Sequence, residues 1–287
     1  MVECIYEMKN IRHYLVSLAL LTTMFDIAVS AEKIGGRQFI AMLSGLPAEA
    51  REQRIYEAVT GGNIPDCTGR FEPIVERQPD AAGNMHTVEI LVTADYIAVG
   101  NDSDYVRMPM LPATAQRIAS ELDASLPTRK IVDMIHRHSA VKLHPCPMLP
   151  DSTMVTLPVF VEHNRLIADS LNAADYFRKG IVAGHKKDIV ITNRLTEYGR
   201  VFIYGWHYPD GLPIQPLSGV HHSHYADYSH GVRLVAQNVV VDGKSWRLSE
   251  LLSDPVLYRL LSDEEGPMQW TEYPLDGVEN LPNKGGE

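Results

Sequence analysis

The chain has 287 residues, which is enough for one large domain or two small ones with a substantial core. Hydrophobic residues make up 45% and charged residues 22%, an ordinary globular composition that argues against a disordered chain. The formal net charge is −10, and no run of Lys and Arg is longer than a pair. A nucleic-acid partner is therefore not expected, because phosphate binding needs a basic face.

The N-terminal segment is typical of an export signal. Lys9 and Arg12 precede an apolar run over residues 14–31, which ends in small residues. We expect residues 1–31 to be a cleaved signal peptide and the mature protein to be secreted or periplasmic. Asp26 interrupts the apolar run, which leaves a buried N-terminal helix as the alternative. No later segment reaches spanning length, so no stable membrane span is expected.

The cysteines leave two alternatives open. Cys4 would be removed with the signal peptide, and Cys67 and Cys146 would remain. These two can form one disulfide in an oxidising compartment, or each can be a lone buried thiol. Neither lies in a recognisable nucleophile motif.

The first half of the mature chain is predicted to contain both helices and strands. Residues 39–60 combine apolar and charged residues at helical spacing and end at a Gly-Gly-Asn sequence. Residues 86–99 alternate and are rich in Val and Ile, which predicts two strands or one bent strand. A polar turn over residues 100–104 then predicts a hairpin with a strand at residues 105–110.

Two helices follow, each with a threonine at the expected N-cap. Thr114 precedes residues 115–122, and Thr128 precedes residues 129–138. Four prolines then interrupt regular structure over residues 144–158, which we expect to form a linker or a crossover.

The second half is predicted to be richer in strands. Helices are expected over residues 159–176 and 248–261. Between them, short strands are expected at residues 187–192, 200–208, 231–235 and 239–241.

This order of elements predicts an α+β fold with a mixed or antiparallel sheet and flanking helices, rather than a doubly wound sheet. We expect two lobes, residues 32–150 and 151–287, that share one core, with the histidine-rich stretch on the second. No Gly-rich loop follows a strand, so a nucleotide cofactor has no support.

Histidines are concentrated in the second half. Five of the twelve lie between Tyr204 and Leu234, in a stretch rich in Tyr, Gly and Pro. Histidine titrates near neutral pH and is the commonest metal ligand, so this density indicates a functional site. Four residues that can act as ligands are spaced three apart: His221, His224, Asp227 and His230.

One interpretation of this spacing is a metal site. A hydrolytic zinc needs about three His, Asp, Glu or Cys ligands and one open position for water. His221 and His224 are the candidate ligands, with His207 and Asp227 available to complete the set. The alternative is a metal-free cluster, in which the histidines form hydrogen bonds with tyrosines and backbone groups.

A second interpretation is acid–base catalysis. His207 and His230 are candidate catalytic residues, with Asp227 to orient them and Ser229 as a candidate nucleophile. Adjacent residues on a strand point to opposite faces, so the base for Ser229 would be His207 or His221. If the strands of His207 and His230 are neighbours in an antiparallel sheet, the two rings can meet near one sheet end, with the intervening loop folded over them.

Substrate contacts are expected from nearby aromatic and basic side chains. Aromatic residues offer a large contact area with polar tips, although core packing is equally expected of any one of them. The aromatic candidates are Tyr204, Trp206, Tyr225 and Tyr228, and the basic ones are His185, Lys187 and Arg233. For residues 185–188, a solvated turn is the favoured alternative.

Residues 229–234, Ser-His-Gly-Val-Arg-Leu, resemble the Ser-His-Gly-Cys-hydrophobic-Arg-Leu signature of L,D-transpeptidases. These exported enzymes cross-link peptidoglycan through a cysteine thioester. An upstream histidine near a glycine is also similar, here His207 with Gly205. The cysteine that belongs between Gly231 and Val232 is missing, so thioester chemistry is not expected of this chain.

Three further phrases resemble those of a family of exported bacterial proteins known mainly as uncharacterised sequences. They are AGHKKD at residues 183–188, IYGWH at residues 203–207 and DYSHG at residues 227–231. This resemblance covers most of the mature chain. It implies export and a single architecture, and it implies no reaction.

These features predict a secreted hydrolase or transferase that acts on a cell-envelope or extracellular polymer, such as peptidoglycan or a glycan, with or without zinc. The alternative is a non-catalytic extracellular protein that binds glycan or peptide, which includes an L,D-transpeptidase-like fold without its nucleophile. Geometry separates the two, because catalysis requires the histidines to converge within hydrogen-bond or metal-ligand reach in one pocket.

Overall fold

The computed structural model describes residues 32–171, 180–196 and 199–275. Contacts between residues define a unit over Lys33–Glu287, and the fold described here is that of this unit. The predicted signal peptide, residues 1–31, lies outside the described residues.

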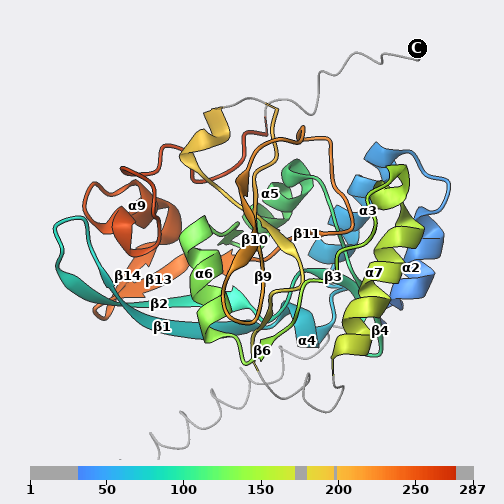
Figure 1. Ribbon diagram of the computed structural model, residues 1–287, viewed down its shortest axis with the longest axis horizontal. Coiled ribbons are helices and arrows are strands. Elements are labelled where there is room, and N and C mark those ends of the chain that lie inside the picture. The colour runs from blue at the N-terminus through green and yellow to red at the C-terminus, as the bar shows by residue number, and fades with distance from the viewer. Residues whose placement is uncertain (1–31, 172–179, 197–198, 276–287) are drawn as a thin grey trace, which may run out of the picture. The chain divides into compact units, whose positions relative to one another are not determined.

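The unit has the predicted α+β class, and its largest sheet is antiparallel (Figure 1). The strands pair in the order β14-β13-β2-β12-β5, and β1 pairs with the other edge of β2. They are β1 (Phe71–Pro79), β2 (Met85–Thr93), β5 (Ala124–Ser125), β12 (Val235–Ala236), β13 (Asn238–Val241) and β14 (Lys244–Arg247). Residues from both predicted lobes therefore share this sheet, and the boundary at residue 150 stays a prediction.

The second sheet carries most of the sequence motifs. Its strands are β10 (Pro213–Ser218), β9 (Ile203–His207), β8 (Lys187–Ile189) and β11 (His230–Gly231), in that order. β9 runs antiparallel to β8, whereas β11 runs parallel to it. The condition that the strands of His207 and His230 are antiparallel neighbours is not met, because β8 lies between them. A 3-10 helix, η2 (Asn193–Thr196), follows β8 in the chain.

The first predicted helix is divided into two. α2 (Gly36–Leu43) and α3 (Ala48–Thr60) replace it. Gly45 has a φ of +79°, and Pro47 occupies the N-cap position of α3, so the chain cannot stay helical between the two elements. A one-turn helix, α4 (Asp66–Gly69), then leads into β1.

Two predictions in the middle of the chain are confirmed. The hairpin consists of β3 (Ala98–Asn101) and β4 (Asp104–Arg107). The second threonine-capped helix is α6 (Arg129–His138), and the Thr128 side chain accepts a hydrogen bond from the Ile131 N–H.

Two helices differ from prediction because of a proline. α5 (Pro112–Glu121) begins at a proline, whose fixed φ suits the first turn, so Thr114 lies inside the helix rather than at its cap. The closing helix is instead α9 (Leu248–Ser253) followed by the 3-10 helix η3 (Leu257–Leu260). Pro255 lies between them and lacks the N–H that a continuous helix needs.

The proline-rich segment contains one short element, η1 (Ser152–Val155), before α7 (Leu157–Ser170). α7 begins slightly earlier than predicted, and its predicted continuation beyond residue 171 lies outside the described residues. β6 (Val141–Lys142) precedes this region in the chain and β7 (Val182–Ala183) follows it, and the two strands pair in parallel. Among the described helices, none is long and apolar enough to cross a bilayer.

Six of the described strands were not predicted: β1, β10, β14 and the two-residue strands β5, β6 and β7. β1 and β10 each contain two prolines, which are normally read as ending a strand. Both are edge strands, where the missing proline N–H leaves no sheet hydrogen bond unmade.

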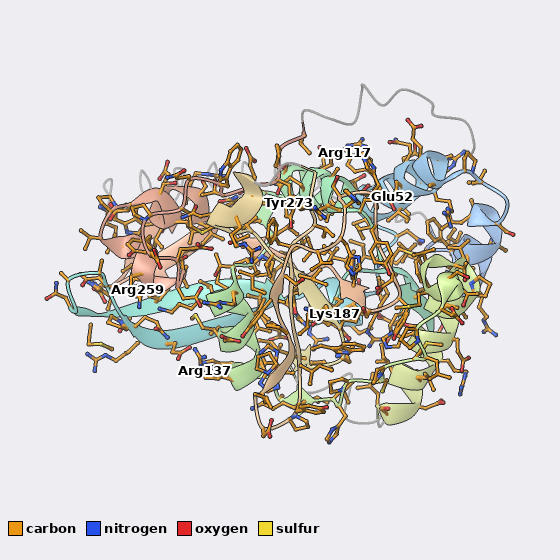
Figure 2. The ribbon with its side chains drawn as sticks, turned by 45° about the horizontal axis from the view of Figure 1, so that its top comes forward. Glu52, Arg117, Arg137, Lys187, Arg259 and Tyr273 are labelled. Atoms are coloured by element: carbon orange, nitrogen blue, oxygen red, sulfur yellow. The ribbon has the colours of Figure 1, made fainter. Side chains whose placement is uncertain are left out.

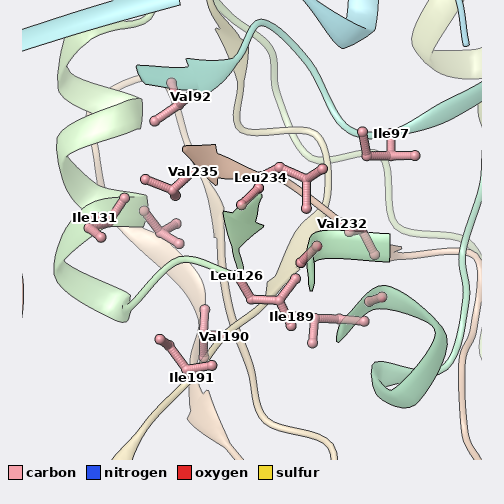
Figure 3. Close-up of a cluster of buried hydrophobic side chains, with 14 of the residues drawn as sticks. Val92, Ile97, Leu126, Ile131, Ile189, Val190, Ile191, Val232, Leu234 and Val235 are labelled. Carbon is pink, nitrogen blue, oxygen red and sulfur yellow. The ribbon is translucent and has the colours of Figure 1, made fainter. Parts of the chain in front are cut away.

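One hydrophobic cluster joins α6 to both sheets (Figure 3). Its members in the close-up are each at most 1% exposed: Val92, Ile97, Leu126, Ile131, Ile189, Val190, Ile191, Val232, Leu234 and Val235. The continuous apolar run after Asp188 is buried on both faces, as expected for a strand covered on each side. This packing fixes α6 against β9 and so positions His136 of α6 next to His207 of β9.

Candidate functional site

The five histidines of the predicted cluster have separate neighbours. His207, on β9, stacks on His136 of α6 with ring centroids 4.7 Å apart. His230, on β11, instead has His221 as its nearest histidine ring, at 6.5 Å between centroids. The remaining two histidines of the stretch are exposed: His222 and His224. The histidines therefore do not converge in one pocket.

His207 is held by a carboxylate of α6. Its Nε2–H donates to Asp133 Oδ1 at 3.0 Å, and the Tyr204 hydroxyl donates to the same oxygen at 2.9 Å. This contact fixes the tautomer of the ring, since a carboxylate can only accept. The His207 side chain is 3% exposed and that of Asp133 is 35% exposed, so solvent reaches mainly the carboxylate.

A distortion of β9 brings Tyr204 and His207 to the same carboxylate. Residues three apart on a regular strand point to opposite faces. Gly205 and Trp206, between them, have φ values of +104° and +54°, which breaks this alternation. A Cβ on Gly205 would lie 3.2 Å from the His207 ring, so only glycine fits there without displacement. A positive φ at tryptophan costs about 1–3 kcal/mol, and such strain is concentrated at functional sites.

His230 is a buried imidazole whose two ring nitrogens have no hydrogen-bond partner within the described part of the chain. Burial lowers the pKa of His230 to about 4, although the charge of Asp227 opposes this shift. The ring is therefore neutral at pH 7. Its complete burial separates it from any ligand at the surface.

Asp227 organises the loop before His230. Its Oδ1 accepts the Ser229 N–H at 2.8 Å and the Ser229 hydroxyl at 2.5 Å, and its Oδ2 accepts the Tyr225 hydroxyl at 3.0 Å. Burial opposes ionisation of Asp227, but His230 and the hydrogen bonds from Ser229 hold its pKa below the usual value. Ser229 is fully buried, and its hydroxyl donates a hydrogen bond to a carboxylate rather than to a histidine. This is not the pairing that a serine nucleophile requires.

The segment from His185 to Asp188 lies mostly in the interior, so the predicted solvated turn is wrong. His185 Nε2–H donates to Asp95 at 3.0 Å, and Lys186 Nζ donates to the Tyr228 carbonyl at 2.5 Å. Burial lowers the pKa of Lys186 to about 7 and that of His185 to about 4. His185 thus stabilises the interior and does not reach a surface ligand.

Arg233, a predicted substrate contact, also has no exposed surface. Its guanidinium lies 4.4 Å from the centroid of the Tyr96 ring and donates to the carbonyls of Thr93 and Val182. The Tyr96 hydroxyl in turn donates to Asp188 at 2.8 Å, and burial raises the pKa of Asp188 to about 6. Arg233 therefore joins strands in the interior instead of binding substrate.

The other predicted substrate contacts are divided between interior and surface. Tyr204, Trp206 and Tyr228 are buried. The Lys187 ammonium lies 4.8 Å from the Trp206 ring centroid, and partial burial lowers its pKa. Tyr225 is partly exposed, and it is the predicted aromatic contact that lines a cavity.

The predicted zinc site does not assemble. No group of three or more His, Cys, Asp or Glu side chains placed to share a metal ion occurs in the described ranges. His221 stacks on Tyr225, and His224 is exposed, so these two candidate ligands gain no third ligand there.

The structure also decides whether Cys67 and Cys146 form a disulfide. Cys146 carries a free thiol and is partly exposed, so the Cys67–Cys146 disulfide is not formed.

A large groove lies beside the loop of residues 222–226. Its volume is about 1590 Å³. We call it the α3 groove, because most of residues 47–55 line one side of it. The start of α5, parts of residues 151–160 and the 222–226 loop line other parts of it, together with Pro109, Leu111, Leu195, Gly199, Arg200, Tyr273 and Pro274. Figure 2 labels three lining residues along one side of the unit: Glu52, Arg117 and Tyr273.

Tyr225 is a rigid aromatic surface in this groove. One face of its ring is covered by His221, with centroids 4.2 Å apart and an interplanar angle of 15°. Its hydroxyl is tied to Asp227, and burial raises its pKa to about 12, so the phenol stays protonated. A ring fixed in this way offers contact area without losing side-chain entropy on binding.

Arg200 connects the groove to a second cavity of about 480 Å³. The second cavity is lined by Arg194, Arg200 and residues 217–220. Arg200 Nη1 donates to the Val220 carbonyl at 2.7 Å, which fixes the guanidinium at the junction.

Sequence reasoning found the 222–226 loop through its histidines and Tyr225, but it missed the rest of the groove. α3, α5 and η1 contribute a mixture of apolar, polar and charged residues that forms no motif in the sequence. Only the tertiary fold brings them together.

Searches of protein-family models, of curated proteins and of solved structures find nothing that matches this chain.

Proposed function

We propose that this chain is a binding protein that holds an extended polymer segment, peptide or glycan, in the α3 groove. The observation that carries the proposal is the rigid Tyr225 surface in a groove large enough for several residues or sugar units. If residues 1–31 are an export signal, the polymer belongs to the cell envelope or the extracellular space.

The burial of the predicted catalytic residues favours binding over catalysis in this groove. His207, Asp227, Ser229 and His230 are each at most 3% exposed, and none of them lines the groove. A general base must lie within hydrogen-bond reach of the proton it removes. These four residues do not meet that requirement for a ligand in the groove.

The proposal is tested by blocking the groove. Val155 lines it and is 38% exposed, so Val155→Arg fills space without removing a buried contact. We expect affinity for the bound polymer to fall about tenfold or more. The measurement is isothermal titration calorimetry with three probes: chitohexaose, soluble peptidoglycan fragments and a pool of apolar octapeptides.

Val256→Arg is the matched control. Val256 is 41% exposed and lies outside the groove, so this variant should bind like the wild-type protein. Failure of all three probes to bind, or equal binding by both variants, would contradict the proposal.

A hydrolase or transferase is the second candidate, and the Asp133–His207 contact favours it. Asp133 is accessible to solvent while it orients a histidine, next to a strained backbone. This candidate predicts release of soluble fragments from peptidoglycan and loss of that release in Asp133→Asn. Asp169→Asn, on the exposed face of α7, is the control. Equal release by both variants, or no release by the wild-type protein, rejects it.

A further inference from the structure

The charged lining of the α3 groove is mixed on the α3 side, where Glu49, Arg51, Glu52 and Arg117 all occur. Glu52 accepts the Leu111 N–H at 3.1 Å and is also bonded to Thr114. Asp151, which lines another part, accepts the Thr153 N–H and hydroxyl. Glu52 and Asp151 are therefore held in place by neutral hydrogen-bond donors of the protein itself.

The second cavity, which Arg200 also lines, has no carboxylate among the lining residues that the structure describes. The Arg200 guanidinium forms no ion pair with a carboxylate among the described residues, and its assigned hydrogen bond uses Nη1 alone. Arg194 lines the adjoining cavity, and His222 and His224 line the groove beside Arg200. In a chain with a net charge of −10, this junction brings two arginines close to two histidines.

The lining of the groove also includes many apolar residues. Leu111, Met154, Leu157, Phe160 and Leu195 line it, together with several prolines. Aliphatic walls suit apolar side chains, whereas a sugar needs polar groups placed to bond its hydroxyls. An apolar peptide therefore fits this apolar part of the lining better than a glycan.

Resting on the proposed function, we infer that the ligand is an apolar peptide whose carboxylate binds Arg200 at the junction of the two cavities. A guanidinium presents parallel N–H groups that match the two oxygens of a carboxylate. The C-terminal carboxylate and an acidic side chain share this chemistry, and the experiment separates them.

The test changes the ligand and leaves the wild-type protein intact. Three pools of acetylated octapeptides built from Ala, Val, Leu and Pro are compared by isothermal titration calorimetry. The first has a free C-terminus, the second is C-terminally amidated, and the third is amidated but contains one Glu. We expect the first or the third pool to bind about tenfold tighter than the second, because a charge-assisted hydrogen bond is lost with the amide. The preferred pool identifies the source of the carboxylate.

Arg200→Gln should remove the preference between charged and amidated pools, and Arg200→Lys should retain part of it. Arg77→Gln, on the exposed face of β1, is the matched control and should keep the full preference. Thermal melting of each variant checks the fold.

Equal binding of all three pools overturns the inference but leaves the groove proposal in place, provided that Val155→Arg still blocks binding. Binding of chitohexaose without any peptide pool rejects the peptide class and again leaves the groove intact. If no probe binds, the proposed function fails, and the inference fails with it.

Discussion

At the scale of single residues, backbone conformation decides which side chains of β9 act together. The sequence pattern predicted an ordinary strand, on which Tyr204 and His207 would face opposite ways. Gly205 and Trp206 break that alternation, and both side chains reach Asp133. No pattern of residue types predicts a tryptophan at a positive φ, so the shared contact of Tyr204 and His207 with Asp133 could not be predicted from the sequence.

Gly205→Ala is expected to destabilise the protein by about 2–4 kcal/mol, because it combines backbone strain with a close contact to the His207 ring. Gly83→Ala is the matched control. Gly83 has a φ of +89° with no atom within 4 Å of the added Cβ, so strain of about 1 kcal/mol is expected to act alone. Urea unfolding measures both. An equal loss in the two variants would show that the contact with His207 contributes nothing.

At the scale of elements, local signals were sufficient for α6 and for the β3–β4 hairpin. The cap at Thr128 and the polar turn at residues 100–104 each act within a few residues. Strand pairing was not predictable in the same way. β8 enters between β9 and β11, and β11 pairs in parallel, because burial of the whole unit selects the neighbours.

The candidate site likewise combines features that local sequence predicts with features that only the tertiary fold creates. The histidine-rich stretch pointed to Tyr225 and the loop of the groove, which is a local feature. The groove itself depends on α3, α5 and η1, which are distant in the chain and carry no motif. The sequence did not indicate that His230 is buried, because a histidine in a two-residue strand can face either way.

At the scale of the whole unit, a buried polar network joins the two predicted lobes. Asp95 accepts hydrogen bonds from Arg107 and from His185, which lie on opposite sides of residue 150. A buried charge left without its partner costs several kcal/mol, so the two halves are expected to unfold together. The network also makes the stability of the fold depend on pH.

Three histidines have pKa values lowered to about 4 by burial, from a usual value of 6.5: His136, His185 and His230. Between these values the unfolded chain binds more protons than the folded one, so their stabilising contribution is lost as pH falls from 6.5 toward 4. Asp188, with its pKa raised from 3.8 to about 6, acts in the opposite direction, because the folded state holds its proton below pH 6. Burial lowers the pKa of His163 in the same direction, to about 2, and His86, whose pKa is raised by its hydrogen bonds to Asp242 and Asp80, acts with Asp188. Four groups oppose two, so acidification should destabilise the fold.

We expect the free energy of unfolding to fall by about 2–4 kcal/mol between pH 7 and pH 5. His230 offers the sharpest test, because its ring nitrogens have no partner to lose within the described residues. In His230→Phe the decrease should be smaller by about 1–2 kcal/mol. His144→Phe, at an exposed position, should leave the decrease as in the wild-type protein. Urea unfolding at the two pH values measures all three proteins, and an unchanged decrease in His230→Phe would mean that this imidazole is not held neutral by burial.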